Sequence, residues 1–566
     1  MDAGTGKCSP WREWEFWLIA ALVAAIYFSR VADLPIRGEE TRRAMVAWET
    51  LQTGDWIVPQ QQGQPFLSRP PVGSWPIAWT AWALGDLSLW AVRLPTVLAT
   101  LLTTLLVYAY SRQFLARYAA LCAGLAYATG IQVLQLGRVA ETEATFTLLL
   151  SAALLVWHWG YTARWSASRT WYLAYALVAI ATLVKSMQAP VYFCGAVGLF
   201  LIWQRDWKFL ISKTHAAGLC VFAVLFAAWQ LPFYWRMGAA AVHDVWSGDV
   251  GLRFADVTLK VFFTHLLTYP IEVGAALCPW ALLLPAYIWP QFRRTIGAAK
   301  PMVVFLAIAW LVALPTCWLV PNARPRYIMP LYPLAAPLVG LVVQRLTEIK
   351  TVPVVRLGWL CWIGGLMFAA IGGGAVVAAA SWNAKIVIPA IHQTPWFAAI
   401  YLAAALCTAA VLAMAWRRWT PTAVAASALA VAGLLGLSAS GVVVNSLVEL
   451  DPGTGAQIAE LKTRLPNVKP LASLGQVGTM FSYYWRDPIR VVSQAIPTNS
   501  NEVPGDVDCF CFNWTDDPLP QLPFPWRVEA ILHCNREIES GVESQVVVGR
   551  RVDVVALAPD ETEFRE

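Results

Sequence analysis

The densest group of charged residues lies directly after the first apolar stretch of the chain. Between residues 37 and 43 the order is Arg-Gly-Glu-Glu-Thr-Arg-Arg. Glu39 and Glu40 are carboxylates that could activate or orient a hydroxyl group, and Arg42 offers a planar fork of N–H donors. Glu39 and Arg42 are also three residues apart, so in a helix they could form an ordinary ion pair. Residue spacing alone leaves both interpretations open.

Isolated charges also stand at the ends of later apolar stretches. Glu141 and Glu143 precede one such stretch, and Lys185 follows another. Further conspicuous bases are Arg69, Arg324 and Arg326, with Tyr327 beside the last. Arginine offers paired N–H donors and lysine a point charge, and both kinds of group bind anions.

Each of these residues also has a simpler explanation. Lys185 could extend its ammonium group to the membrane interface from the end of a span. Arg138 could cap a helix or pair with Glu141. Arg326 and Tyr327 could form a plain interfacial anchor.

The composition shows what kind of molecule positions these residues. The 566 residues are 58% hydrophobic and only 13% charged, whereas a soluble domain is about 45–50% apolar and about 25% charged. The apolar stretches are about 20 residues long, unlike the alternating segments of about 10 residues in an outer-membrane barrel. The sequence therefore predicts an all-α polytopic membrane bundle and excludes an ordinary cytosolic enzyme.

The breaks between apolar stretches alternate in charge. One set is rich in Lys and Arg, which is typical of cytoplasmic loops, and the other carries acids, proline and single bases. This pattern predicts about thirteen transmembrane helices, beginning with residues 14–28, with the N-terminus cytoplasmic and the C-terminus extracytoplasmic. The prolines at 330, 333 and 337 predict one irregular span.

The chain changes character near residue 445. Residues 445–566 contain 10 basic and 18 acidic residues, whereas residues 1–444 contain 31 basic and 17 acidic ones. We therefore expect a membrane domain over 1–444 and a small water-exposed α/β domain over 445–566, with strands near 468–474, 489–492 and 546–557 and a helix within 475–485. In an oxidising compartment Cys534 is expected to pair with Cys509 or Cys511.

Four motifs occur in an order that resembles a known family. Residues 39–75, EETRRAMVAWETLQTGDWIVPQQQGQPFLSRPPVGSW, resemble the signature of bacterial dolichyl-phosphate-mannose protein mannosyltransferase-like proteins. Gly137-Arg138 ahead of Glu141 and Glu143, the sequence LVKS at 183–186 and RPRYIMPLYP at 324–333 follow in the family's order. These proteins belong to the GT-C glycosyltransferases and include the aminoarabinose transferase that acts on lipid A.

The resemblance implies sugar transfer, with inversion, from a polyprenyl-phosphate donor on the outer face of the bacterial inner membrane. Glu39 takes the position of the family's catalytic Asp, Glu40 is the second acid of that pair, and the first outer loop, about 35–90, is catalytic. Glu143 takes the position of a further acid, also Asp in the family, with Glu141 as the alternative. Lys185, Arg69, Arg324, Arg326 and Tyr327 would bind the donor phosphate. Arg42, Glu141 and Arg138 would position the acceptor or the sugar.

The remaining expectations concern partners, cofactors and rival functions. The acceptor is a lipid such as lipid A, a glycan or a protein, membrane lipid surrounds the bundle, and no nucleic acid is involved. A divalent cation is left open, with His265 and Asp249 as candidate ligands. A transporter or flippase of a lipid-linked sugar precursor is the alternative function, but we find no internal repeat of the kind transporters carry. A non-catalytic membrane anchor would leave the charged outer loop unexplained.

Overall fold

A computed structural model describes most of the chain. The described residues are 9–252, 257–348, 395–418, 420–449, 453–466, 470–493, 495–499, 502–515, 518–536 and 543–552. The chain forms two compact units, each assembled from separate stretches of sequence. The helical unit comprises Met1–Leu34, Leu67–Thr80 and Ser88–Glu449. The mixed unit comprises Pro35–Phe66, Ala81–Leu87 and Leu450–Glu566.

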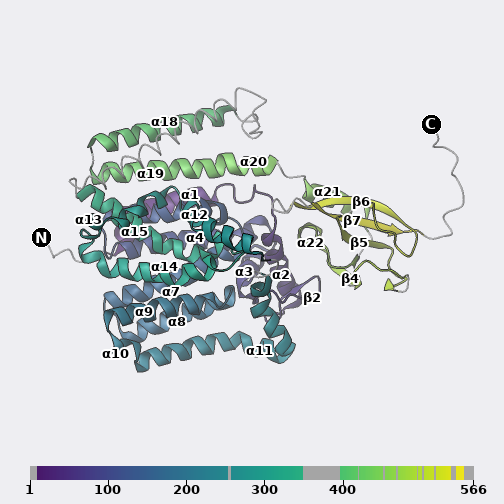
Figure 1. Ribbon diagram of the computed structural model, residues 1–566. Helices are drawn as coiled ribbons and strands as arrows, with labels where there is room; N and C mark the ends of the chain where they lie inside the picture. Colours follow the sequence, from purple (N-terminus) through teal and green to yellow (C-terminus); the bar gives the residue numbers. More distant parts are fainter. Residues whose placement is uncertain are drawn as a thin grey trace. The chain divides into compact units, whose positions relative to one another are not determined.

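Long apolar helices make up the helical unit (Figure 1). Its first half contains α1 (Trp14–Phe28), α4 (Leu89–Ser111), α5 (Arg117–Ala128), α6 (Ile131–Leu136), α7 (Thr142–Thr162), α8 (Ala167–Val184), α9 (Gln188–Gln204) and α10 (Trp207–Leu210). Its second half contains α11 (Lys213–Leu252), α12 (Leu259–Ala276), α13 (Pro290–Arg293), α14 (Lys300–Trp318), α15 (Tyr332–Glu348), α18 (Pro395–Arg418), α19 (Pro421–Leu437) and α20 (Val444–Glu449). Shorter 3₁₀ turns and a π-helical stretch complete it: η1 (Pro10–Arg12), η2 (Pro71–Gly73), η3 (Trp280–Ile288), η4 (Gly297–Ala299), η5 (Pro325–Leu331) and η6 (Ser438–Val443). Helix α3 spans Trp75–Leu84.

Eight of the described helices are long and apolar enough to cross a membrane, and a ninth is obtained if the bent pair α12 and η3 is one span. The first predicted span coincides with α1, which at 15 residues is shorter than these eight. A span expected over residues 357–380 lies outside the described residues. The chain is a polytopic helical membrane protein, as its composition predicts, while the count of about thirteen spans is not confirmed.

The predicted irregular span is confirmed at η5 and α15. Three prolines interrupt the hydrogen-bond ladder here, and the chain follows a 3₁₀ path over Pro325–Leu331 before the α-helix begins at Tyr332. Farther along α15, a Cβ atom on Gly340 would come within 2.6 Å of the Ala119 carbonyl oxygen in α5. Glycine therefore allows α5 and α15 to pack backbone to backbone.

The mixed unit combines one long helix with a small α/β fold. Its elements are α2 (Glu39–Thr53), β1 (Gln60–Gln61), β2 (Gln64–Pro65), α21 (Thr454–Arg464), β3 (Leu471–Leu474), α22 (Thr479–Trp485), β4 (Ile489–Ser493), β5 (Cys509–Trp514), β6 (Trp526–Arg536) and β7 (Glu543–Arg551). The five-stranded sheet has the order β4-β3-β5-β7-β6. Strand β3 is parallel to both β4 and β5, whereas β7 is antiparallel to β5 and β6.

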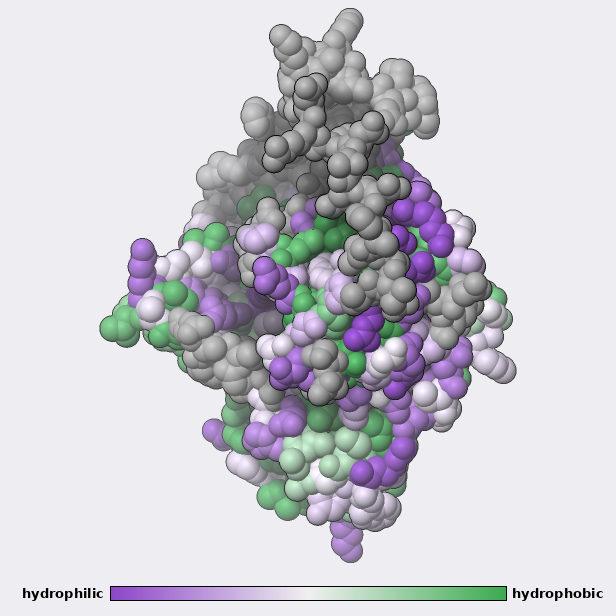
Figure 2. Space-filling model, turned by 90° about the vertical axis from the view of Figure 1, so that its right-hand side faces the viewer, coloured by the Kyte–Doolittle hydropathy of each residue, from purple (hydrophilic) through white to green (hydrophobic). Residues whose placement is uncertain are grey.

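The predicted strands and helix of the C-terminal region correspond to β3, β4, β7 and α22, although residues 553–557 lie outside the described part. The helix α21 and the strands β5 and β6 were not predicted from the sequence, and no helix was assigned to the range of α2 beyond the helical spacing of Glu39 and Arg42. Helix α2 ends at Gly54, which adopts a left-handed conformation and returns its N–H to the Thr50 carbonyl. Figure 2 shows one face of the molecule, on which hydrophilic and hydrophobic side chains of the described residues are interspersed.

The expected disulfide is absent. Cys509, Cys511 and Cys534 are buried free thiols in the core of the sheet. Cys511 donates to the Ala472 carbonyl at 3.4 Å, so this thiol contributes to packing. Burial raises the pKa of the Cys509 thiol to about 11 and that of Cys534 to about 12, which leaves both protonated at neutral pH.

The burial of these three cysteines predicts that their thiols are alkylated slowly. With iodoacetamide at about pH 8, the three thiols should be alkylated far more slowly in the folded protein than after denaturation in guanidinium chloride, because burial removes both access and thiolate. Peptide mass spectrometry without a reducing agent measures the label at each cysteine. A cross-linked pair of C-terminal peptides that resists alkylation after denaturation would show that the disulfide forms after all.

Candidate functional site

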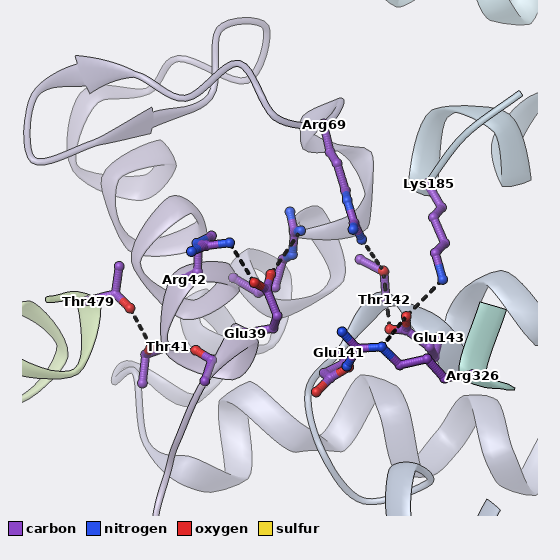
Figure 3. Close-up of polar contacts among 12 residues, drawn as sticks. Glu39, Thr41, Arg42, Arg69, Glu141, Thr142, Glu143, Lys185, Arg326 and Thr479 are labelled. Atoms are coloured by element: carbon purple, nitrogen blue, oxygen red, sulfur yellow. Dashed lines mark hydrogen bonds and ion pairs between the residues drawn. The ribbon is translucent and has the colours of Figure 1, made fainter. Parts of the chain in front are cut away.

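A cluster of buried charges lies in the helical unit, where three segments meet (Figure 3). Lys185 donates to Glu143 Oε1 at 2.8 Å, and these two side chains are 3% and 4% exposed. Arg326 donates from Nη1 to Glu141 Oε2 at 2.9 Å, and its Nε lies 4.0 Å from Glu143 Oε1. A buried charge without a partner is costly. The two carboxylates and the two cations of this cluster therefore stabilise one another.

Helix ends bring these residues together. Glu143 lies in the first turn of α7, and Lys185 caps the C-terminus of the neighbouring α8. An acid at a helix N-terminus and a base at a C-terminus both interact favourably with the helix dipoles. Arg326 comes from the proline-rich turn η5, whose 3₁₀ path precedes α15. The sequence predicted the positions of Glu143 and Lys185 at span ends, and the structure agrees.

Arg69 reaches the same cluster from the loop before η2. Its Nη1 donates to Thr142 Oγ1 at 3.3 Å, and Thr142 Oγ1 lies 3.5 Å from Glu143 Oε2. The following turn packs against the end of α8, because a Cβ atom on Gly73 would come within 2.8 Å of the Val184 carbonyl oxygen. The absence of a side chain at Gly73 therefore keeps the Arg69 segment close to the end of α8.

Aromatic rings line the cationic side of the cluster. The Lys185 ammonium lies 5.3 Å from the Tyr327 ring and 5.5 Å from the Phe146 ring, and the Arg326 guanidinium lies 5.8 Å from Tyr327. Such faces attract cations while excluding water. Sequence reasoning missed Thr142 and Phe146, because a lone Thr and a lone Phe beside a span carry no signal of their own.

Glu39 occupies the N-terminus of α2 in the mixed unit (Figure 3). Its two carboxylate oxygens face two guanidinium groups: Arg42 donates to Oε1 and Arg43 donates to Oε2 at 3.4 Å. The intrahelical pair that the spacing allowed is therefore present, and Arg43 adds a second one at helical spacing. Arg42 and Arg43 both lie near the ring of Phe66, at 5.9 and 5.8 Å.

A second carboxylate of α2 serves a different purpose. Glu49 accepts hydrogen bonds from the backbone N–H of Gln62 and, at 3.0 Å, from that of Gly63. Burial raises the pKa of the Glu49 carboxyl, and these two N–H groups offset part of that rise. Glu49 thus binds the turn between β1 and β2, a role that its sequence position did not indicate.

The other sequence candidates have separate surroundings. Arg138 is 3% exposed and donates to the Ile26 carbonyl and to Ser440 Oγ, each at 3.1 Å, with Tyr27 under its guanidinium. Its hydrogen bonds in the structure thus do not include Glu141. Glu40 is fully buried, and Arg324 is exposed at the start of η5.

No group of three or more His, Cys, Asp or Glu residues within the described ranges could hold a metal ion. His265 Nε2 lies 3.2 Å from the Cys317 carbonyl oxygen. The side chain of Asp249 lies outside the described residues.

Parts of the chain are similar in sequence to known glycosyltransferases. Residues 68–231 match the family described as dolichyl-phosphate-mannose-protein mannosyltransferase. The chain is 30% identical over 346 residues to an undecaprenyl phosphate-alpha-4-amino-4-deoxy-L-arabinose arabinosyl transferase of Edwardsiella ictaluri, and 29% identical over 316 residues to that of Pseudomonas aeruginosa strain UCBPP-PA14. The matches cover 58% and 54% of this chain. The chain spans 60% and 56% of the length of these relatives.

Solved structures extend the likeness along the chain. The crystal structure of ArnT from Cupriavidus metallidurans bound to undecaprenyl phosphate has a TM-score of 0.67 to this chain, with 17% identity over 94% of this chain and 97% of that one. Its apo form has a TM-score of 0.68. The chain has the GT-C fold of these glycosyltransferases. These similarities support the family resemblance seen in the sequence, and the buried charge cluster lies at the ends of α7 and α8 of this fold.

The charge cluster predicts that substitution of Glu143 and substitution of Lys185 lower the thermal stability by different amounts. Glu143→Gln leaves Lys185 among the cations Arg69 and Arg326, whereas Lys185→Met leaves Glu143 with cations still nearby. We expect Glu143→Gln to lower the Tm in detergent more than Lys185→Met, since an unpaired buried charge costs about 3–5 kcal/mol. The double variant should recover part of the loss. A double variant whose Tm falls by the sum of the two single effects would contradict the pairing.

Proposed function

We propose that the chain is an inverting membrane glycosyltransferase that moves a sugar from a polyprenyl-phosphate-linked donor to an acceptor on the outer face of the bacterial inner membrane. The named activity of its relatives, which use undecaprenyl phosphate sugars, supports this donor class. The acceptor is lipid A, another glycan or a protein.

The buried charge cluster is the observation that carries the proposal. Arg69, Lys185 and Arg326 supply three positive charges against two negative ones on Glu141 and Glu143. The excess of one positive charge matches the single negative charge of a sugar phosphodiester. When the glycosidic bond breaks, the lipid phosphate gains a second negative charge, which nearby cations stabilise.

Both central cations retain donors for such a phosphate. The Lys185 ammonium has three N–H groups, and Glu143 accepts one of them. Arg326 Nε is buried and makes no hydrogen bond within the described residues. We assign the donor phosphate to these two groups and to Arg69, with Tyr327 as a wall of the site and Arg324 at its exposed edge.

Glu39 is proposed to act on the acceptor. If the acceptor is a hydroxyl, this carboxylate removes its proton; if the acceptor is a phosphate, little base is needed and the carboxylate orients the sugar. The guanidinium groups of Arg42 and Arg43 compete with an acceptor for the same oxygens, which favours the orienting role. By their positions in the family's motifs, Glu40 and Glu143 are the further proposed catalytic acids. Arg42, Glu141 and Arg138 are proposed to position the acceptor or the sugar.

The proposed topology follows the charge pattern of the loops. About thirteen spans place the N-terminus in the cytoplasm and the C-terminus outside. Residues 1–444 form the transferase domain with its catalytic first outer loop, about 35–90, and residues 445–566 form an extracytoplasmic domain. Membrane lipid surrounds the spans, no nucleic acid takes part, and a divalent cation stays an open possibility.

The test is transfer of labelled sugar from synthetic polyprenyl-phosphate sugars in membranes that contain the wild type, Glu39→Gln or Lys185→Met. Glu39→Gln should abolish transfer to a hydroxyl acceptor but only weaken transfer to a phosphate. Lys185→Met should lower kcat about 100-fold or more, because a charged group that stabilises the leaving phosphate is lost. Separation of lipid, glycan and protein fractions identifies the acceptor.

Glu460→Gln is the matched control, since this carboxylate is 71% exposed on α21. It should transfer like the wild type. Lipid-linked sugar that crosses the bilayer without any transfer, in membranes where the protein is folded, would replace the proposed transferase by a flippase.

A further inference from the structure

The turn between β1 and β2 holds a glutamine in an unfavourable conformation. Gln61 pairs with Gln64, so Gln62 and Gly63 form a two-residue turn, and both have positive φ, 53° and 68°. Glycine and asparagine are the usual residues for such a type I′ turn. A glutamine with positive φ costs conformational free energy, which indicates that its side chain is needed where the turn puts it.

The Gln62 side chain is fully engaged with the C-terminal fold. Its Nε2 donates to the Val477 carbonyl at 2.7 Å and to Ser482 Oγ at 2.8 Å, and its Oε1 accepts from Val477 N–H at 3.1 Å. The residue is 6% exposed. One side-chain amide thus bonds both backbone groups of Val477, as a neighbouring strand would.

Val477 belongs to the loop at the switch point of the sheet. The chain leaves β3, passes through α22 to β4 on one side, and then returns to β5 on the other side of β3. Small ligands of open α/β sheets bind in the crevice at the carboxyl ends of the strands at this point. Asn513, from β5, stiffens the loop by bonding Gly478 N–H and the Gln476 carbonyl. Gln62 therefore occupies the place where such a sheet would hold a ligand.

Two further contacts connect this loop region to α2. The Thr41 hydroxyl donates to the Gly38 carbonyl, so the Thr479 hydroxyl must donate to Thr41 Oγ1, which is 2.6 Å away. Glu49 binds both N–H groups of the turn that carries Gln62. Helix α2 is therefore held near both of its ends, and Glu39 lies two residues before Thr41.

We propose that the C-terminal α/β fold is a positioning module for the Glu39 helix, with Gln62, Thr479 and Glu49 as positioning residues. The inference rests on the proposed function, in which Glu39 acts on the acceptor. The loop between β3 and α22 binds the Gln62 side chain. It thereby fixes the orientation and the position of α2 against the C-terminal fold. The donor cations of the helical unit are not part of this set of contacts.

The test compares Gln62→Leu with Gln64→Leu, a matched change on the same hairpin that removes none of these bonds. Gln62→Leu should lower kcat by about 10- to 100-fold, as expected for a reacting group displaced by about 1 Å, and leave the KM for the donor unchanged. Gln64→Leu should behave like the wild type. Unchanged kcat in folded Gln62→Leu, or an equal loss in Gln64→Leu, would overturn the positioning role.

A disulfide between α2 and α22 tests the positioning role in a second way. Thr41→Cys with Thr479→Cys should oxidise readily, because the two oxygens they replace are 2.6 Å apart. In the Gln62→Leu background, oxidation should restore kcat and reduction should remove the gain; no gain on oxidation would contradict the inference.

Glu39→Gln in the same assay distinguishes failure of the proposed function of Glu39 from failure of the positioning role. If the wild type and Glu39→Gln give equal transfer, the proposed function of Glu39 fails. If transfer depends on Glu39 but Gln62→Leu retains full kcat, only the positioning role fails.

Discussion

The buried ion pair between Lys185 and Glu143 is the constraint on which the helical unit depends. Two charges that are almost fully buried are tolerable only if they stay paired and if other charges balance them. This requires the end of α8, the start of α7 and the turn η5 to meet at one place. The glycine contact at Gly73 and the proline-rich path of η5 serve that requirement, since each lets a backbone approach more closely than a regular helix with side chains would.

The sequence predicted the parts of this site whose signal is local. Lys185 and Glu143 were recognisable because charged residues are rare at the ends of apolar stretches, and the irregular span was recognisable from its prolines. The pairing of Arg326 with Glu141 was not predictable, because it joins residues 185 positions apart. Arg138 shows the opposite case. Its position in the sequence suggests Glu141 as a partner, but in the structure it donates to the Ile26 carbonyl and to Ser440.

The C-terminal region was predictable only in part for a similar reason. Strand β3 is a short apolar run, and α22 follows a glycine turn, so both have local signatures. Strands β5 and β6 contain cysteine, asparagine and charged residues, and they are strands because β7 pairs with both. The assignment of Gln62 to the β3–α22 loop could not be read from sequence, because a glutamine in a polar loop carries no indication of its partner.

The distance along the chain between Gln62 and Val477 has a consequence for biosynthesis. These residues are 415 positions apart, and a ribosome adds about 5–20 residues per second, so roughly 20 to 80 s pass before the second one is made. During that interval the hairpin is complete, but its glutamine amide cannot yet make these bonds. The hydrogen bonds between Gln62 and Val477 can therefore form only after the membrane spans between these residues have been synthesised.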